Sequence, residues 1–143
     1  MIVQSTIDIR LLGNPRAVAM AVRGLLDGVV LINQLLMYQY AFPKLIESKI
    51  RFRREPTEGT GLEEFATCDE VLKRGWGDCD DLAPYLCAEL RGTRGLEPLV
   101  PKRLQRGEDA SIRVHRRPDN RQYHVLVRRG NGDIIDPSRY LGM

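Results

Sequence analysis

Cys79 stands in an acidic, glycine-flanked segment that the sequence pattern places at the start of an amphipathic helix. The segment reads Gly-Trp-Gly-Asp-Cys-Asp-Asp-Leu-Ala over residues 75–83. The first turn of a helix leaves backbone N–H groups unpaired, and their partial positive charge favours a thiolate over a thiol. A cysteine at this position is a candidate nucleophile.

Two further side chains that a thiol nucleophile requires occur later in the chain. His124 lies in a strand-like segment, Tyr-His-Val-Leu-Val, and Asp136 begins a turn before Pro137. A histidine beside the thiol can take its proton, and a carboxylate can orient the imidazole. Non-catalytic interpretations stay open, because His124 could be a surface residue and Asp136 could only initiate a turn.

The order of cysteine, histidine and aspartate resembles that of the transglutaminase-like superfamily, which is related to the papain-like cysteine proteases. Residues 77–83, Gly-Asp-Cys-Asp-Asp-Leu-Ala, are similar to the Gly-Asp-Cys-Glu-Asp-Tyr-Ala signature of bacterial transglutaminase-like cysteine proteinases. His124-Val125 and Ile135-Asp136-Pro137-Ser138 continue the match, so that the resemblance covers residues 67–138.

The resemblance implies a thiol hydrolase or acyltransferase that cleaves an amide bond of a peptide or a glutamine side chain. In it Cys79 would be the nucleophile, His124 the general base and acid, and Asp136 the residue that orients the imidazole. Papain has an oxyanion-stabilising glutamine six residues before its cysteine, where this chain has Lys73. The backbone N–H of Cys79 is therefore the first candidate oxyanion donor, and the second is not identified.

Two functions from different classes remain open. Hydrolysis is favoured over transamidation only because a small chain has little room for an amine-donor site. The alternative is a weakly active or inactive binding or structural module, such as a phage or bacterial assembly component. The missing oxyanion glutamine favours this alternative, since a module without turnover needs no such donor.

Composition indicates one soluble domain over residues 1–143, with 43% hydrophobic and 29% charged residues. The spacing of Cys68, Cys79 and Cys87 matches neither a metal site nor a disulfide framework, which indicates a reducing compartment. The first residues lack the pattern of a secretory signal, so we expect the protein in the cytoplasm. Cys68 and Cys87 are expected to be packing residues.

The N-terminal half is expected to be helical. Asn14-Pro15 is typical of a helix start, and apolar residues then recur every three or four positions as far as about Tyr40. Gly24 and Gly28 leave open whether this is one helix or two. The most apolar stretch, residues 29–42, is too short to span a membrane, so no membrane partner is expected.

The remaining patterns predict short helices followed by a sheet. We expect a strand over 49–54, a loop over 55–61, a helix over 68–74, and a helix from Asp78 to Gly92 in which Pro84 disturbs the second turn. Strands over 110–117, 122–129 and around 134–135 complete the fold, with a turn at 118–120. The fold class is therefore α+β, with N-terminal helices packed on a C-terminal antiparallel sheet. The resemblance adds a papain-like or transglutaminase-like core.

The register of the last hairpin tests Asp136 independently of the resemblance. A two-residue turn at Asn131-Gly132 would place Asp136 on the sheet face away from His124. A three-residue loop over 130–132 would place Asp136 opposite Leu126, on the His124 face. A triad therefore requires the longer loop.

Three further features have open interpretations. Trp76 could bind substrate or belong to the core. The acidic side chains of Asp78, Asp80 and Asp81 could hold calcium, although helix capping is the favoured interpretation and no other cofactor is expected. The basic residues of the C-terminal half, His115 among them, are expected on a solvated surface that could contact an acidic assembly partner. Nucleic acid is the less favoured partner.

Overall fold

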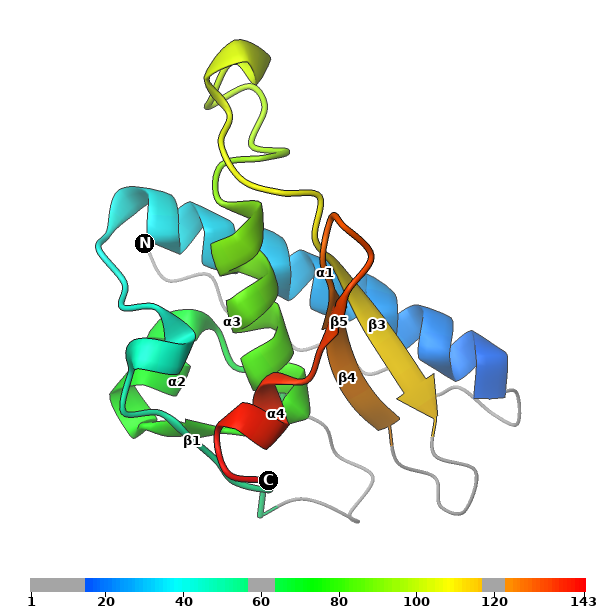
Figure 1. Ribbon diagram of the computed structural model, residues 1–143. Helices are drawn as coiled ribbons and strands as arrows, with labels where there is room; N and C mark the ends of the chain where they lie inside the picture. Colours follow the sequence, from blue (N-terminus) through cyan, green and yellow to red (C-terminus); the bar gives the residue numbers. More distant parts are fainter. Residues whose placement is uncertain (1–14, 57–63, 117–122) are drawn as a thin grey trace.

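The computed structural model describes residues 15–56, 64–116 and 123–143 (Figure 1). The expected turn at 118–120 and most of the expected loop at 55–61 lie outside the described residues. Within them, helices dominate the N-terminal part and an antiparallel sheet forms near the C-terminus, as the α+β pattern predicted.

Helix α1 (Pro15–Gln39) is one unbroken helix, which decides between the one-helix and two-helix alternatives. A Cβ atom added at Gly24 or Gly28 would meet nothing within 4 Å, so both glycines face open space. On the opposite side, Leu26 and Val30 are buried in the core. The helix therefore keeps one apolar face packed, and its glycines lie where packing does not depend on them.

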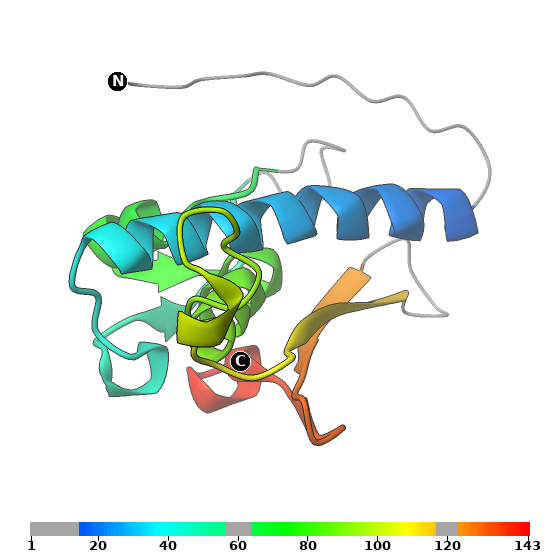
Figure 2. The same cartoon turned by 90° about the horizontal axis from the view of Figure 1, so that it is seen from above.

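Helix α1 lies along one side of the molecule and contacts helix α3 (Cys79–Arg91) and strand β3 (Ser111–Arg116) (Figure 2). By length and composition, its segment from Arg16 to Gln39 could also cross a membrane. A core helix of a soluble protein passes the same test.

Helix α2 (Cys68–Arg74) ends as the sequence predicted, with Gly75 in the left-handed conformation at φ 77°. The next residues, Trp76 and Gly77, form strand β2, which pairs in parallel with strand β1 (Arg51–Phe52). The strand expected over 49–54 is therefore shorter than predicted. Strand β2 has only two residues that can pair with β1. Because β1 and β2 are distant in the chain, the local sequence did not indicate their parallel pairing.

Helix α3 begins at Cys79 and runs unbroken through Pro84 to Arg91. Its residues from Leu82 to Ala88 are buried, so tertiary packing holds the helix where proline removes one backbone hydrogen bond. The helix contacts α1, the sheet and α2. This central position fixes the direction in which the N-terminal end of α3, with Cys79, points.

The C-terminal sheet has the order β3-β4-β5 and is antiparallel throughout. Strand β4 (Tyr123–Arg128) lies between β3 and the short β5 (Ile134–Ile135). Ile112, Val125 and Val127 are buried against the helices. Helix α4 (Pro137–Tyr140) follows β5 directly, and two single-turn helices, η1 (Leu45–Glu47) and η2 (Lys102–Leu104), lie in connections.

Candidate functional site

Cys79 is the first residue of α3, where the sequence placed it. Asp78 precedes the helix, and its backbone N–H donates to Asp81 Oδ2 at 3.3 Å while its carbonyl accepts from Leu82 N at 2.9 Å. The Cys79 side chain is half-buried. The thiol thus lies beside the positive end of a 13-residue helix and outside the fully buried core.

His124 and Asp136 are hydrogen bonded, with 2.7 Å between His124 Nε2 and Asp136 Oδ2. The sheet register explains how they meet. Val127 pairs with Ile135, which by continuation places Asp136 opposite Leu126.

The connecting loop is the longer one that this register requires. Arg129 N donates to Asp133 O at 2.8 Å, and residues 130–132 form the loop between them. Gly132 has φ 94°, the left-handed conformation that glycine adopts without steric cost. The prediction of a three-residue loop is confirmed.

The thiol lies next to the strand that carries the histidine. Cys79 Sγ is 3.9 Å from the carbonyl oxygen of Tyr123, which directly precedes His124. No hydrogen bond joins the thiol to the imidazole among the residues the structure describes. The structure therefore joins His124 to Asp136 and places the Cys79 thiol against the backbone of the residue that precedes His124.

The bond to Asp136 assigns the nitrogen atoms of the imidazole. An ionised carboxylate only accepts hydrogen bonds, so Nε2 carries the proton in this pair. That leaves Nδ1 of neutral His124 as the basic nitrogen. An imidazole in this tautomer can accept a thiol proton through Nδ1 and spread the resulting positive charge toward Asp136.

Asp136 itself is held from two further sides. Its Oδ1 accepts from the backbone N–H of Ser138 at 3.1 Å and so caps α4. The exposed guanidinium of Arg139 lies 3.4 Å from Oδ2. The turn-initiator interpretation and the orienting interpretation of Asp136 are therefore compatible, since its two oxygens make different contacts.

His115 lies directly opposite His124 in the pairing of β3 with β4. Opposite residues of an antiparallel pair share a sheet face, so both imidazoles belong to the same face. The side chain of His115 is exposed, as expected from the sequence. His115 therefore serves as an internal control for His124: both lie on the same sheet face, but only His124 is hydrogen bonded to Asp136.

The other two cysteines belong to the core, as expected. Cys68 and Cys87 are fully buried. Burial raises the pKa of each thiol from 9.0 to about 12. A reagent that needs a thiolate should therefore distinguish Cys79 from both of them.

Trp76 is half-buried and has arginine groups against its ring. The guanidinium carbon of Arg74 lies 3.9 Å from the ring centroid, and that of Arg53 lies 5.2 Å from it. Arg74 also donates to the carbonyl of Trp76 and to the carboxylate of Asp81. A substrate that stacked on this indole would compete with these cation–π contacts.

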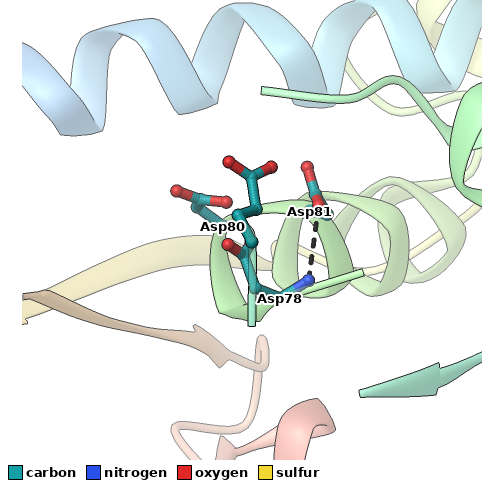
Figure 3. Close-up of side chains that lie close together, drawn as sticks. Asp78, Asp80 and Asp81 are labelled. Carbon is teal, nitrogen blue, oxygen red and sulfur yellow. Dashed lines mark hydrogen bonds between the residues drawn. The ribbon is translucent and has the colours of Figure 1, made fainter. Parts of the chain in front are cut away.

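Four carboxylates gather beside the thiol. Asp78, Asp80 and Asp81 come from the start of α3 (Figure 3), and Glu55, which the sequence analysis did not select, follows β1. One oxygen from each of the four lies within 4.8 Å of the others. Glu55 joins this acidic cluster because β1 pairs with β2 immediately before α3, a contact without a local sequence signal.

Burial dominates the electrostatics of this acidic cluster. Asp80 is 8% exposed, and its Oδ1 has no hydrogen-bond partner among the described residues. Burial and the neighbouring carboxylates raise the pKa of Asp80 well above its usual range. Burial and Asp78 raise the pKa of Asp81 to about 7, although Ala66 N and Arg74 act in the opposite direction. Uncompensated negative charge is therefore costly here, and a divalent cation would relieve that cost.

Comparison with known proteins adds no assignment. The chain matches no family model, no curated protein and no solved structure. The functional interpretation consequently depends on the residues and geometry of this chain.

Proposed function

We propose that the protein is a thiol hydrolase or acyltransferase in which Cys79, His124 and Asp136 form a catalytic triad acting on an amide bond of a peptide or glutamine side chain. The observation that carries this proposal is the 2.7 Å bond between His124 and Asp136, formed beside the strand end that Cys79 contacts. It agrees with a papain-like or transglutaminase-like core, in which a helix N-terminus presents the nucleophile.

In the proposed reaction, Nδ1 of His124 takes the proton of the Cys79 thiol, and the thiolate attacks the carbonyl carbon of the amide. When the tetrahedral intermediate collapses, the C–N bond breaks and His124 returns the proton to the leaving amine. The product is a thioester on Cys79, which water or an amine then cleaves, regenerating the thiol. Asp136 stays ionised and stabilises the imidazolium while it carries the extra proton.

The oxyanion of this intermediate needs donors that point toward it. The backbone N–H of Cys79, at the start of α3, is the first donor we propose, because its helix dipole favours negative charge. Lys73, at the position of the papain glutamine, is an exposed residue of α2.

Selective alkylation tests the proposal without a known substrate. Iodoacetamide should modify Cys79 at about pH 6, where Cys68 and Cys87 stay unreactive, and mass spectrometry of the digested protein identifies the site. His124→Ala should remove this low-pH reactivity. His115→Ala is the matched control, because that histidine lies opposite on the neighbouring strand and should leave the reactivity unchanged.

A chromogenic ester tests turnover directly. With p-nitrophenyl acetate, the proposal requires a burst of nitrophenol of about one equivalent per chain, followed by slower release, and no burst with Cys79→Ala. Equal slow alkylation of all three cysteines, together with no burst, would contradict the proposal. That result would instead support a binding or structural module, such as a phage or bacterial assembly component.

Lys73, exposed at the position of the papain glutamine, favours this second candidate function, because a module without turnover needs no oxyanion donor. In this function the basic surface of the C-terminal half would contact an acidic assembly partner.

The absence of a disulfide among the three described cysteines agrees with the reducing cytoplasm, where we place the protein.

Calcium at the acidic cluster is a further part of the proposal. Asp78, Asp80 and Glu55 would supply oxygen ligands, and the buried, unpaired oxygen of Asp80 fits a hard cation. A bound cation would cancel negative charge beside Cys79 and so favour its thiolate. Calcium should therefore raise the rate of Cys79 alkylation in the wild-type protein, and it should not change that rate in the Asp80→Asn variant.

A further inference from the structure

A cavity lies at the C-terminal end of α3, away from Cys79. It has a volume of about 400 Å³ and is formed by the last turns of α1, residues 41–44 and the last turn of α3. Small-molecule sites commonly occupy cavities of roughly 300–1,000 Å³. Ten residues of helix separate Cys79 from Glu89 in its wall, which corresponds to about 15 Å. The cavity is therefore distinct from the proposed triad.

Two helix ends contribute partial negative charge to the cavity. Helices α1 and α3 both end at it, and the C-terminal end of a helix carries partial negative charge. Glu89 is the only acid among the described lining residues. Its Oε2 accepts from Leu45 N at 2.8 Å, and its Oε1 receives no hydrogen bond from the described residues. The carboxylate therefore keeps one oxygen for another donor.

Glu89 is half-buried, so its carboxylate is partly removed from water. Burial raises the pKa of this carboxyl, and the neighbouring Glu47 adds to the effect, whereas Lys44 and the Leu45 N–H lower it. Lys44 is exposed on the cavity wall. A positive group close to Glu89 would offset the desolvation of its carboxylate.

Aromatic side chains supply the apolar part of the wall. Tyr38 and Tyr40 remain 52% and 63% exposed although both line the cavity, and Phe42 packs edge-on against Tyr85 with 6.5 Å between ring centroids. Aromatic ring faces attract ammonium groups, and aromatic walls around a carboxylate are typical of ammonium sites. Two tyrosines left accessible beside a half-buried glutamate suit this chemistry.

We propose that this cavity binds an alkylammonium group, with Glu89 accepting from the ammonium and Tyr38, Tyr40 and Phe42 enclosing the alkyl chain. The ammonium could come from a lysine side chain of a peptide or from a free polyamine, since both present the same group on an apolar chain. The site is independent of the triad, so it can hold a ligand whether or not Cys79 is catalytic.

Calorimetric titration of the full chain tests the charge requirement. N-acetyl-lysine methylamide should bind, and N-acetyl-norleucine methylamide, which lacks the ammonium, should bind at least about tenfold more weakly. Cadaverine is the polyamine probe: tighter binding than the lysine probe identifies a free polyamine as the source, and weaker binding identifies a lysine side chain. Equal binding of the lysine and norleucine probes, or no binding of either ammonium probe, would overturn the proposal.

Variants locate the binding. Glu89→Gln retains an acceptor for Leu45 N and should weaken the lysine probe by about tenfold, while Tyr40→Ala should weaken it by about two- to fivefold. Lys44→Met removes the competing cation and should tighten binding, which keeps the test decisive if Glu89→Gln does not fold. Tyr140→Ala, an exposed tyrosine of α4, is the control and should bind as wild type does. Unchanged binding in both Glu89→Gln and Lys44→Met would refute the assignment of the site.

Discussion

The acidic cluster should make the cation-free protein more stable in mild acid than at neutral pH. Asp81 is the carboxyl with a defined shift, because burial and Asp78 raise its pKa from 3.8 to about 7. A raised pKa in the folded state means that the unfolded chain loses this proton first as the pH rises. The free energy of unfolding should therefore fall between about pH 4 and pH 7 and level off above that range.

The magnitude follows from linkage for one carboxyl. With values of 3.8 and about 7, the free energy of unfolding at about pH 5 should exceed that at about pH 7.5 by roughly 2–3 kcal/mol. The bond between Glu108 and Arg129 acts the other way, because it lowers the pKa of Glu108. The Glu108 side chain is 29% exposed at the surface, where solvent screens the ion pair, so it should offset only part of the increase.

Urea unfolding with a calcium chelator present, followed by the fluorescence of Trp76, measures the effect across this pH range. Asp81→Asn should flatten the dependence, and Glu97→Gln, which changes an exposed carboxylate, should leave it intact. Added calcium should also flatten it, since a bound cation keeps the carboxylates ionised. Stability that falls steadily from about pH 7.5 to pH 5 in the chelated protein would contradict a raised pKa of Asp81 in the folded state.

Three further predictions concern single contacts. Asp136→Asn keeps an acceptor for Ser138 N but loses the charge beside His124, so Cys79 alkylation at about pH 6 should slow about fivefold with little change in the unfolding midpoint; an unchanged rate would argue against an orienting role. In Gly28→Ala the added Cβ meets no atom within 4 Å, so this variant should be more stable by about 1 kcal/mol. In Gly107→Ala the added Cβ would lie 2.0 Å from Arg91 O, at a backbone φ of 121°, so this variant should be less stable by roughly 3 kcal/mol. Urea unfolding that showed the same sign of change for both variants would contradict this prediction. Tyr85→Phe removes the 2.8 Å bond to Pro43 O from a fully buried side chain, and thermal unfolding should show a loss of about 1 kcal/mol, whereas no loss would mean that Pro43 O finds another donor.

The sequence predicted the elements whose signals are local. Gly75 after α2 and Asp78 before α3 each act on backbone groups within one turn, and both boundaries occur where expected. The hairpin register was also accessible, because sheet alternation has a period of two and glycine favours the left-handed end of a three-residue loop. From that register the contact between His124 and Asp136 followed.

Other features depend on contacts between segments that are distant in the chain, and these contacts form only in the folded protein. Glu55 joins the acidic cluster because β1 pairs with β2, and the cavity at Glu89 exists because α1 and α3 end side by side. Neither contact lies within a turn or a hairpin, so neither hydrophobic periodicity nor a capping residue indicates it in the sequence. The sequence alone thus determined which side chains could do chemistry, whereas burial decided their charge state, since desolvation by residues far along the chain sets the pKa of Asp81 and Glu89.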